Sequence, residues 1–233
     1  MSKLSTFIYI ILLTCLTSEL ALAQVIYHVA ITEDTPEQAD VSMIISGRAR
    51  ARVLYSRSGD LQTKTQVSNV SCAGKAIRQN NNKEWNIPRN CKQVNWQVDF
   101  VSEDEQGIAA YEQKSVLMSS GKWWVFSSPS ALLRLKREPS DLKIKFDVPF
   151  QKNFEAKLPL KSRPPEYFAL GDVKKQTVRR PGIKLTYISD NPSYTSQFVD
   201  VDDQAQALEY LSAIMGMDEG EVLDTTMIML GIK

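Results

Sequence analysis

The stretch GIKLTYISDNPSYTSQFVDVDDQAQALEYLSAIMGMDEGEVLDTTMIMLGIK, residues 182–233, decides how this chain is interpreted. Residues 183–188 alternate apolar and polar side chains directly after a Pro-Gly pair, which predicts a β-strand. Residues 225–232 are apolar on both faces, and a strand of this kind is expected to be covered on two sides. Only Lys233 follows. We therefore expect a terminal unit whose covering part was lost or was never present.

Between these two strands the sequence predicts a helix. Asp200 stands where an N-cap belongs, and the acidic residues just after it suit the positive end of a helix. Gly216 is placed as the residue that ends the helix. The apolar positions recur at helical spacing; they are Val201, Ala205, Leu208, Leu211 and Met215. Residues 164–233 are thus interpreted as linker strands followed by an incomplete strand-helix-strand unit.

The start of the chain has the features of a secretory signal, which we assign to residues 1–23. Lys3 supplies the positive charge, residues 7–16 the apolar core, and Ala21-Leu22-Ala23 a cleavage site. The apolar run is about ten residues, against the roughly twenty needed to span a bilayer. We therefore predict a periplasmic or secreted protein without a membrane span. A lipoprotein anchored at Cys15 remains the alternative.

Two cysteines, Cys72 and Cys91, remain after this cleavage. In an oxidising compartment a pair so close in sequence predicts a disulfide, which would stabilise the fold by roughly 3 kcal/mol. The alternative, a reactive thiol pair, lacks the C-x-x-C spacing. The formal net charge is +1, so the composition does not indicate nucleic-acid binding. No sequence motif calls for a cofactor.

Short alternating segments without intervening helices dominate residues 24–163. In residues 94–100, for example, Val94, Trp96 and Val98 point one way, while polar side chains point the other. Residues 142–148 repeat this pattern. We predict a mainly β protein: an antiparallel β-sandwich that ends near the Pro-containing boundary at residues 161–165.

Two groups of residues are candidates for ligand binding. Arg48, Arg50 and Arg52 share one face of a predicted strand, as an anion-binding stripe or as an ordinary solvated face. Trp123 and Trp124 precede a predicted turn, where they form either a platform for peptide or carbohydrate or the closed end of the sandwich. The sequence alone leaves both alternatives open.

The chain contains a single histidine, His28. The zinc motif H-E-x-x-H and any site with two histidines therefore cannot be formed from this sequence. A serine-histidine-aspartate arrangement around His28 would lack the G-x-S-x-G nucleophile turn. We expect His28 to be a surface residue of a strand, and we assign no catalytic or metal-binding residue.

The order of elements resembles the front part of the glycyl aminopeptidase family of gluzincin zinc peptidases. The similarity lies in the opening strand 25–29, the strand around Trp96, residues 124–133, and the terminal helix and strand. The resemblance implies an N-terminal β-domain followed by the start of a catalytic domain. The family's zinc-binding and catalytic residues correspond to no position of this chain.

Two functional hypotheses follow. The favoured one is an exported, non-catalytic β-sandwich protein that binds a peptide or protein partner through the exposed edge of its last strand. The second is the N-terminal part of a split or truncated zinc aminopeptidase, whose catalytic part is encoded elsewhere.

Overall fold

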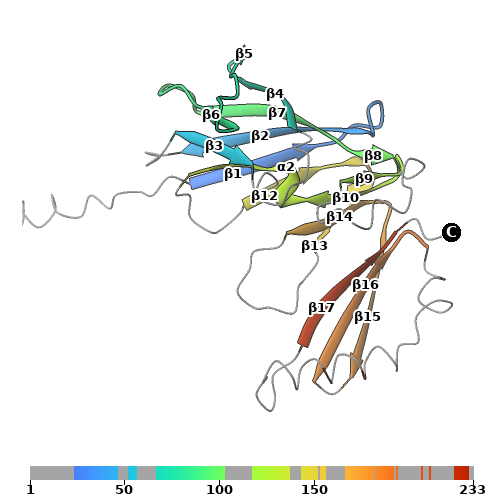
Figure 1. The fold of residues 1–233 in the computed structure, drawn as a ribbon. Coiled ribbons are helices and arrows are strands. Elements are labelled where there is room, and N and C mark those ends of the chain that lie inside the picture. The colour runs from blue at the N-terminus through green and yellow to red at the C-terminus, as the bar shows by residue number, and fades with distance from the viewer. Residues whose placement is uncertain are drawn as a thin grey trace, which may run out of the picture.

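The computed structural model describes residues 24–46, 52–56, 67–102, 117–136, 143–151, 153–155, 166–180, 182–191 and 223–230, together with residues 193, 206 and 210. The regular elements among these residues are almost all β-strands, arranged as a layered sandwich with a smaller sheet below it in the view of Figure 1. The expected signal segment and most of the expected terminal helix lie outside the described residues, although residues 206 and 210 are helical.

The first layer of the sandwich is a six-stranded sheet in the order β12-β1-β2-β7-β4-β5. Its strands are β12 (Lys143–Asp147), β1 (Gln24–Ala30), β2 (Gln38–Ser46), β7 (Gln93–Asp99), β4 (Val67–Cys72) and β5 (Lys75–Ala76). The central strands show the alternation that the sequence predicts, with buried residues facing inward and more exposed residues facing outward. One face of this sheet therefore covers the core and the other is turned to solvent.

The second layer consists of two smaller sheets. One has the order β13 (Asn153–Glu155), β14 (Tyr167–Gly171), β10 (Trp123–Ser127), β9 (Met118–Ser119) and β8 (Val101–Ser102). The other has the order β11 (Leu133–Leu135), β3 (Val53–Ser56) and β6 (Glu84–Asn86). A single helical turn, α2 (Ser128–Ala131), connects β10 to β11, and a short 3-10 turn, η4 (Pro149–Gln151), follows β12.

The core between the layers is built around fully buried aromatic side chains from the six-stranded sheet. The ring centroids of Tyr27 and Trp96 lie 6.3 Å apart in an edge-to-face arrangement. The hydroxyl of Tyr27 donates a hydrogen bond to the carbonyl of Leu133 at 3.1 Å, and Trp96 Nε1 donates to the carbonyl of Ala131 at 2.9 Å. These bonds satisfy the polar ends of buried rings, because an unpaired buried donor would be destabilising. They also tie the first layer to α2, which contains Ala131, and to β11, which begins at Leu133.

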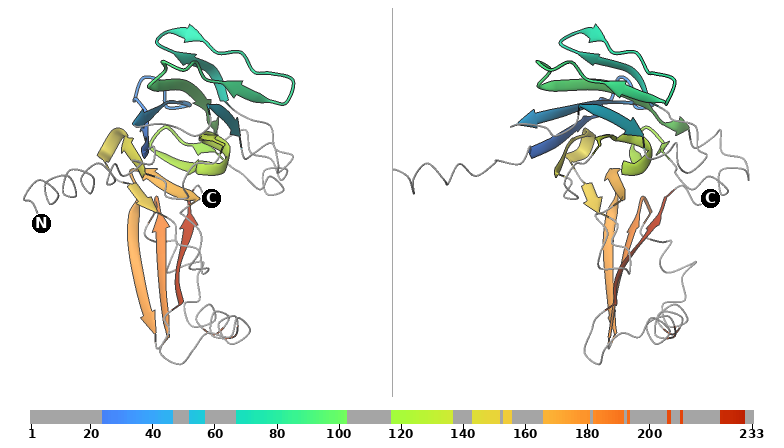
Figure 2. Two further views of the ribbon diagram at one scale, coloured as in Figure 1. Left: turned by 90° about the vertical axis from the view of Figure 1, so that its left-hand side faces the viewer. Right: turned by 60° about the vertical axis from the view of Figure 1, so that its left-hand side comes forward.

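The terminal sheet contains three strands in the order β15 (Lys174–Arg180), β16 (Ile183–Ser189) and β17 (Leu223–Met229). β16 and β17 are parallel, as a strand-helix-strand unit requires. Figure 2 shows this sheet extending away from the sandwich. A buried apolar cluster joins the two units: Trp123 and Ala169 from the sandwich pack with Val173 and Ile188.

The prediction of a mainly β protein is confirmed, with one difference in strand direction. β12 pairs with β1 in parallel, as do β8 with β9 and β16 with β17, so the sheets are not purely antiparallel. Alternation in sequence reports which side chains are buried but carries no information on strand direction. The expected boundary at residues 161–165 lies outside the described residues. β14, which comes after it, still belongs to the sandwich.

Candidate functional site

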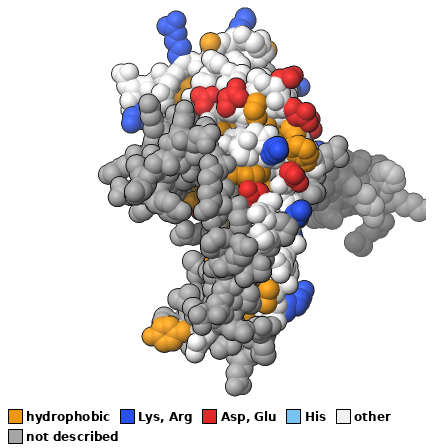
Figure 3. Space-filling model, turned by 90° about the vertical axis from the view of Figure 1, so that its right-hand side faces the viewer, with side chains coloured by type: hydrophobic (Ala, Val, Ile, Leu, Met, Phe, Trp, Pro, Cys, Tyr) orange, Lys and Arg blue, Asp and Glu red, His pale blue; other side chains and the backbone are white. Residues whose placement is uncertain are grey.

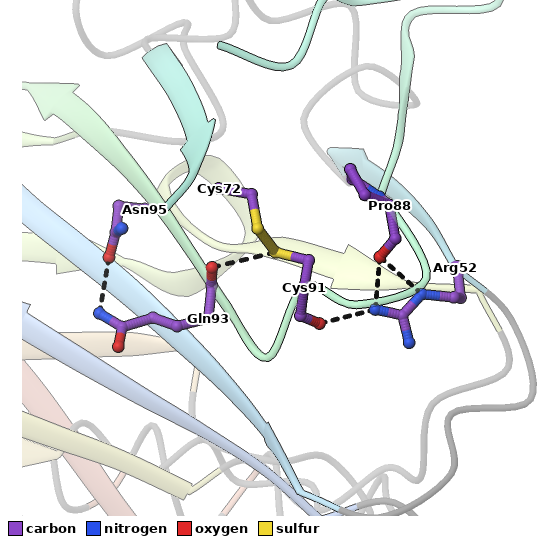
Figure 4. The surroundings of a disulfide bond; sticks show 6 residues. All are labelled: Arg52, Cys72, Pro88, Cys91, Gln93 and Asn95. Atoms are coloured by element: carbon purple, nitrogen blue, oxygen red, sulfur yellow. Dashed lines mark hydrogen bonds between the residues drawn. A yellow bond between two sulfur atoms is a disulfide. The ribbon is translucent and has the colours of Figure 1, made fainter. Parts of the chain in front are cut away.

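The predicted disulfide between Cys72 and Cys91 is present in the structure (Figure 4). It joins the end of β4 to the loop before β7, with the two Cα atoms 6.0 Å apart. The Sγ atom of Cys91 lies 3.1 Å from the carbonyl oxygen of Gln93. This is a van der Waals contact and not a hydrogen bond, because a disulfide sulfur carries no hydrogen. The disulfide is thus a structural tie at one end of the six-stranded sheet.

The Arg52 side chain supports the same loop. Its Nη2 atom donates to the carbonyl oxygens of Pro88 at 2.7 Å and Cys91 at 2.6 Å, and its Nε atom also donates to Pro88 at 3.1 Å. Figure 4 shows the guanidinium turned toward this loop. Arg48 and Arg50 lie outside the described residues. The structure therefore gives Arg52 a positioning role for the disulfide loop.

Trp123 and Trp124 do not form an exposed platform. Their exposed fractions are 3% and 0%, because β10 is covered on both faces. Trp124 Nε1 donates to the carbonyl oxygen of Pro36 at 2.6 Å, which fixes the loop between β1 and β2. Trp123 belongs to the cluster that joins the sandwich to the terminal sheet. The burial of both rings fits the alternative in which the pair closes the sandwich.

The described surface does contain a polar groove, on the outward face of the six-stranded sheet. It encloses about 460 Å³ over four adjacent strands, β1, β2, β7 and β4. Its polar lining consists of His28, Asp40, Ser42, Asn69, Ser71, Asn95 and Gln97. We call this the outer groove. It is placed opposite the core, since these residues alternate with the buried residues of the same strands.

Strand register brings the groove residues together. His28 is opposite Ser42, Ser42 is opposite Asn95, and Asn95 is opposite Ser71, so one polar row crosses the four strands. Side chains opposite one another on one face of a sheet lie about 5 Å apart. Sequence reasoning missed this row. The sequence placed His28 and Asn95 on outward faces of strands, but the order of the strands in the sheet was needed to align them with Ser42 and Ser71.

A β-bulge shapes one wall of the groove. Ser68 pairs with Gln97 and Ser71 with Asn95, so Asn69 and Val70 together lie opposite the single residue between those partners. Asn69 adopts a left-handed backbone conformation with φ of 54°, which asparagine tolerates better than most residues. Bulges redirect side chains in this way. Here the Asn69 amide is turned into the groove, where it donates to Gln97 Oε1.

Hydrogen bonds fix the orientation of several groove side chains. Gln97 accepts the bond from Asn69 and donates from its own amide to Asp40 Oδ1 at 3.2 Å. Gln93 donates to Asn95 Oδ1 at 2.8 Å, which directs the amide nitrogen of Asn95 away from that contact. The result is a chain of polar groups held in place before any ligand arrives.

The groove does not have the geometry of a catalytic triad. His28 lies in a polar row with Ser42, but within the described residues it forms no hydrogen bond with Ser42 or Asp40. The Asp40 carboxylate accepts from Gln97. A nucleophile-base pair needs a hydrogen bond between its members. In the same part of the chain no three histidine, cysteine or acidic side chains gather as metal ligands. The described side chains of the groove are thus hydrogen-bond donors and acceptors that can bind polar groups.

β17 forms an edge of the terminal sheet. It pairs with β16, and no other described strand pairs with it (Figure 1). Met227 is 37% exposed, so the strand is less covered than its apolar sequence predicts. The described helical residues include no segment with the length and hydropathy of a membrane span. On the face drawn in Figure 3, described acidic and basic side chains are interspersed and form no broad patch of one sign.

No family profile matches the chain, and no curated protein matches its sequence. Solved structures do match. An aminopeptidase N family protein from Idiomarina loihiensis is similar with a TM-score of 0.57 and 13% identity, over 88% of this chain and 38% of that chain. An M1 zinc metallopeptidase from Deinococcus radiodurans gives a TM-score of 0.44 and 13% identity, over 88% of this chain and 55% of that chain.

This chain thus spans less than two thirds of the length of either protein. At this level of identity the similarity concerns the fold and leaves the activity open. The resemblance inferred from the order of the strands is confirmed in that sense: the chain has the β-rich fold of part of an aminopeptidase N family protein.

Proposed function

We propose that this chain is an exported, non-catalytic binding module that captures an extended segment of a peptide or protein on the edge of β17. The observation that carries the proposal is the sheet order, in which β17 has β16 on one side and no described strand on the other. Backbone N–H and C=O groups along such an edge can hydrogen-bond to an added strand.

The side chains of β17 favour strand addition. Its sequence, LDTTMIM, contains neither proline nor lysine, the residues that commonly protect an edge from pairing. The one charged side chain, Asp224, forms an ion pair of 2.8 Å with Lys184 on β16. Thr226 and Ile228 are half-buried and Met227 is exposed, so both faces offer contacts to a partner strand.

The absence of catalysis is proposed from the sequence. A zinc aminopeptidase centre of the H-E-x-x-H type requires two histidines, and His28 is the only one among the 233 residues. Export is supported by the disulfide, because such bonds form in oxidising compartments.

A peptide-display experiment tests strand addition. Random extended peptides are selected on the purified protein, and the affinity of the selected peptides is measured by fluorescence anisotropy. Met227→Lys places a charge on the exposed edge and should weaken binding by about tenfold or more. Met227→Leu is the matched control and should bind like the wild type. Failure to select any peptide, or equal affinity for the lysine variant, would count against the edge.

A second candidate function is favoured by the coverage of the similarity. Because 88% of this chain matches only 38% of the aminopeptidase N family protein, the candidate is one part of a divided zinc aminopeptidase. The edge of β17 would then pair with a strand of the catalytic part. Reading the DNA downstream in all frames for H-E-x-x-H tests this. If the motif is found, co-purification of the two products decides between a divided enzyme and an independent module.

A further inference from the structure

We propose that the outer groove is a binding site for a neutral, hydroxyl-rich ligand, namely an oligosaccharide. The site is separate from the β17 edge and does not depend on the peptide binding proposed above. It crosses four strands, and at about 4.8 Å between neighbouring strands the polar row is roughly 14 Å long. Its volume of about 460 Å³ falls within the range of small-molecule sites.

The chemistry of the lining selects the ligand. Amide side chains such as Asn95 and Gln97 offer both donors and acceptors, and the hydroxyls of Ser42 and Ser71 do the same. Sugar hydroxyls also donate and accept, so each can be matched by such a group. The remaining lining residues are Ala30, Val41 and Trp96, which offer apolar contacts to the carbon atoms of a sugar ring.

Charge argues against an ionic ligand. Asp40 is the only acidic side chain in the lining, and it accepts a hydrogen bond from Gln97. No lysine or arginine lines the groove within the described residues. A strongly charged ligand would therefore lose its hydration without gaining an opposing charge cluster.

The backbone argues against a peptide in this groove. β2 and β7 lie inside the sheet, each paired on both sides, so their N–H and C=O groups are already used in the ladder. An extended peptide that binds by strand addition needs an open edge. In the groove only side chains are available to hydrogen-bond a ligand. This suits a ligand that has hydroxyl groups along its whole length.

The groove is also organised in advance. The bonds from Asn69 to Gln97 and from Gln97 to Asp40 hold three side chains across three strands, and Gln93 holds Asn95. Such ordering lowers the entropy lost on binding. The bulge at Asn69 supports the same function, since a regular strand would not turn this amide toward Gln97 in the same way.

The test uses the full secreted chain and four neutral probes: maltohexaose, cellohexaose, xylohexaose and N-acetylchitohexaose. Amide chemical shifts are recorded during titration, and affinities are measured by calorimetry. We expect at least one probe to bind, with shift changes confined to β1, β2, β7 and β4. Asn95→Ala and Gln97→Ala should each weaken binding about five- to tenfold. Asn86→Ala, an exposed amide on β6 outside the groove, should leave the affinity unchanged.

The location of the shift changes decides whether the outer groove binds a sugar. No shift change in the groove with any probe at millimolar concentration, or shifts confined to another surface, would overturn the proposal. So would tighter binding of an anionic polysaccharide or an extended peptide in the same groove. If a variant does not fold, the shift map of the wild type decides alone. Met227→Lys should bind the sugar normally, which separates this site from the proposed peptide-binding edge.

Discussion

Arg52 Nη2 donates a hydrogen bond of 2.6 Å to the carbonyl oxygen of Cys91, so the residue just before β3 in the second layer holds the loop that carries the disulfide of the first layer. Its second acceptor, Pro88, lies in the same loop. A guanidinium can bridge two carbonyls because its donors are arranged in a rigid fork.

Replacing Arg52 with Met should lower the free energy of unfolding by about 1–3 kcal/mol, because charge-assisted hydrogen bonds to two carbonyls are lost. Arg52→Lys should recover only part of this, since an ammonium lacks the fork. Urea unfolding followed by tryptophan fluorescence measures the change. Arg89→Met, on the exposed part of the same loop, is the control. Equal stability of the Arg52 and Arg89 variants would contradict the assignment.

Removing the disulfide by the double change Cys72→Ser and Cys91→Ser should cost about 3 kcal/mol. The bond spans 19 residues, and closing a loop of this size restricts the unfolded chain by about that amount. Thermal unfolding with and without dithiothreitol provides the measurement. The wild type should lose stability in the reductant and the double variant should not respond. A wild type that is indifferent to reduction would show that the bond carries no stability.

Gly171→Ala should destabilise the sandwich by roughly 2–4 kcal/mol. Gly171 has a φ of 91°, and a Cβ there would lie 2.6 Å from the ring of Trp124 and close to the carbonyl of Lys122. Gly74→Ala is the matched control: its φ is 75°, but nothing lies within 4 Å of the added carbon. It should cost only about 1 kcal/mol. Differential scanning calorimetry of both variants separates the cost of the steric clash from the cost of placing alanine at a positive φ. Equal losses of stability in the two variants would exclude the clash.

Burial raises the pKa of the Tyr187 hydroxyl above its ordinary value of 10.0. At a pH between the unfolded and the folded pKa, the hydroxyl therefore keeps its proton in the folded state and has lost it in the unfolded state. The stabilisation is fully present below about pH 10 and is lost as the pH rises through the raised folded value. Tyr187→Phe should therefore lose less stability than the wild type between about pH 9 and pH 11. Urea unfolding across this range checks it, and parallel losses in the two proteins would contradict the prediction.

Sequence patterns predicted those features that depend on local alternation. Val94, Trp96 and Val98 proved buried and Asn95 and Gln97 more exposed, because a strand with one buried face must alternate. The disulfide was also predictable, since Cys72 and Cys91 are the only cysteines after the expected signal.

Features that depend on long-range pairing were not predictable. The outer groove forms because Ser42 lies opposite Asn95 and Asn95 opposite Ser71, and none of these pairings is encoded locally. Arg52 shared an alternating face with Arg48 and Arg50, which suggested a solvated stripe or an anion site. Its actual partners, the carbonyls of Pro88 and Cys91, are backbone groups that a pattern of side chains cannot reveal.

The parallel pairing of β1 with β12 sets an order of assembly for the whole sandwich. Ile26 pairs with Lys143, so the outer edge of the first strand stays uncovered until the chain has been made as far as β12. Contacts this distant in sequence form slowly, and an uncovered strand edge invites pairing with other chains. Any fragment that stops before Lys143 should therefore aggregate during synthesis, whereas chains that include β12 can close that edge themselves.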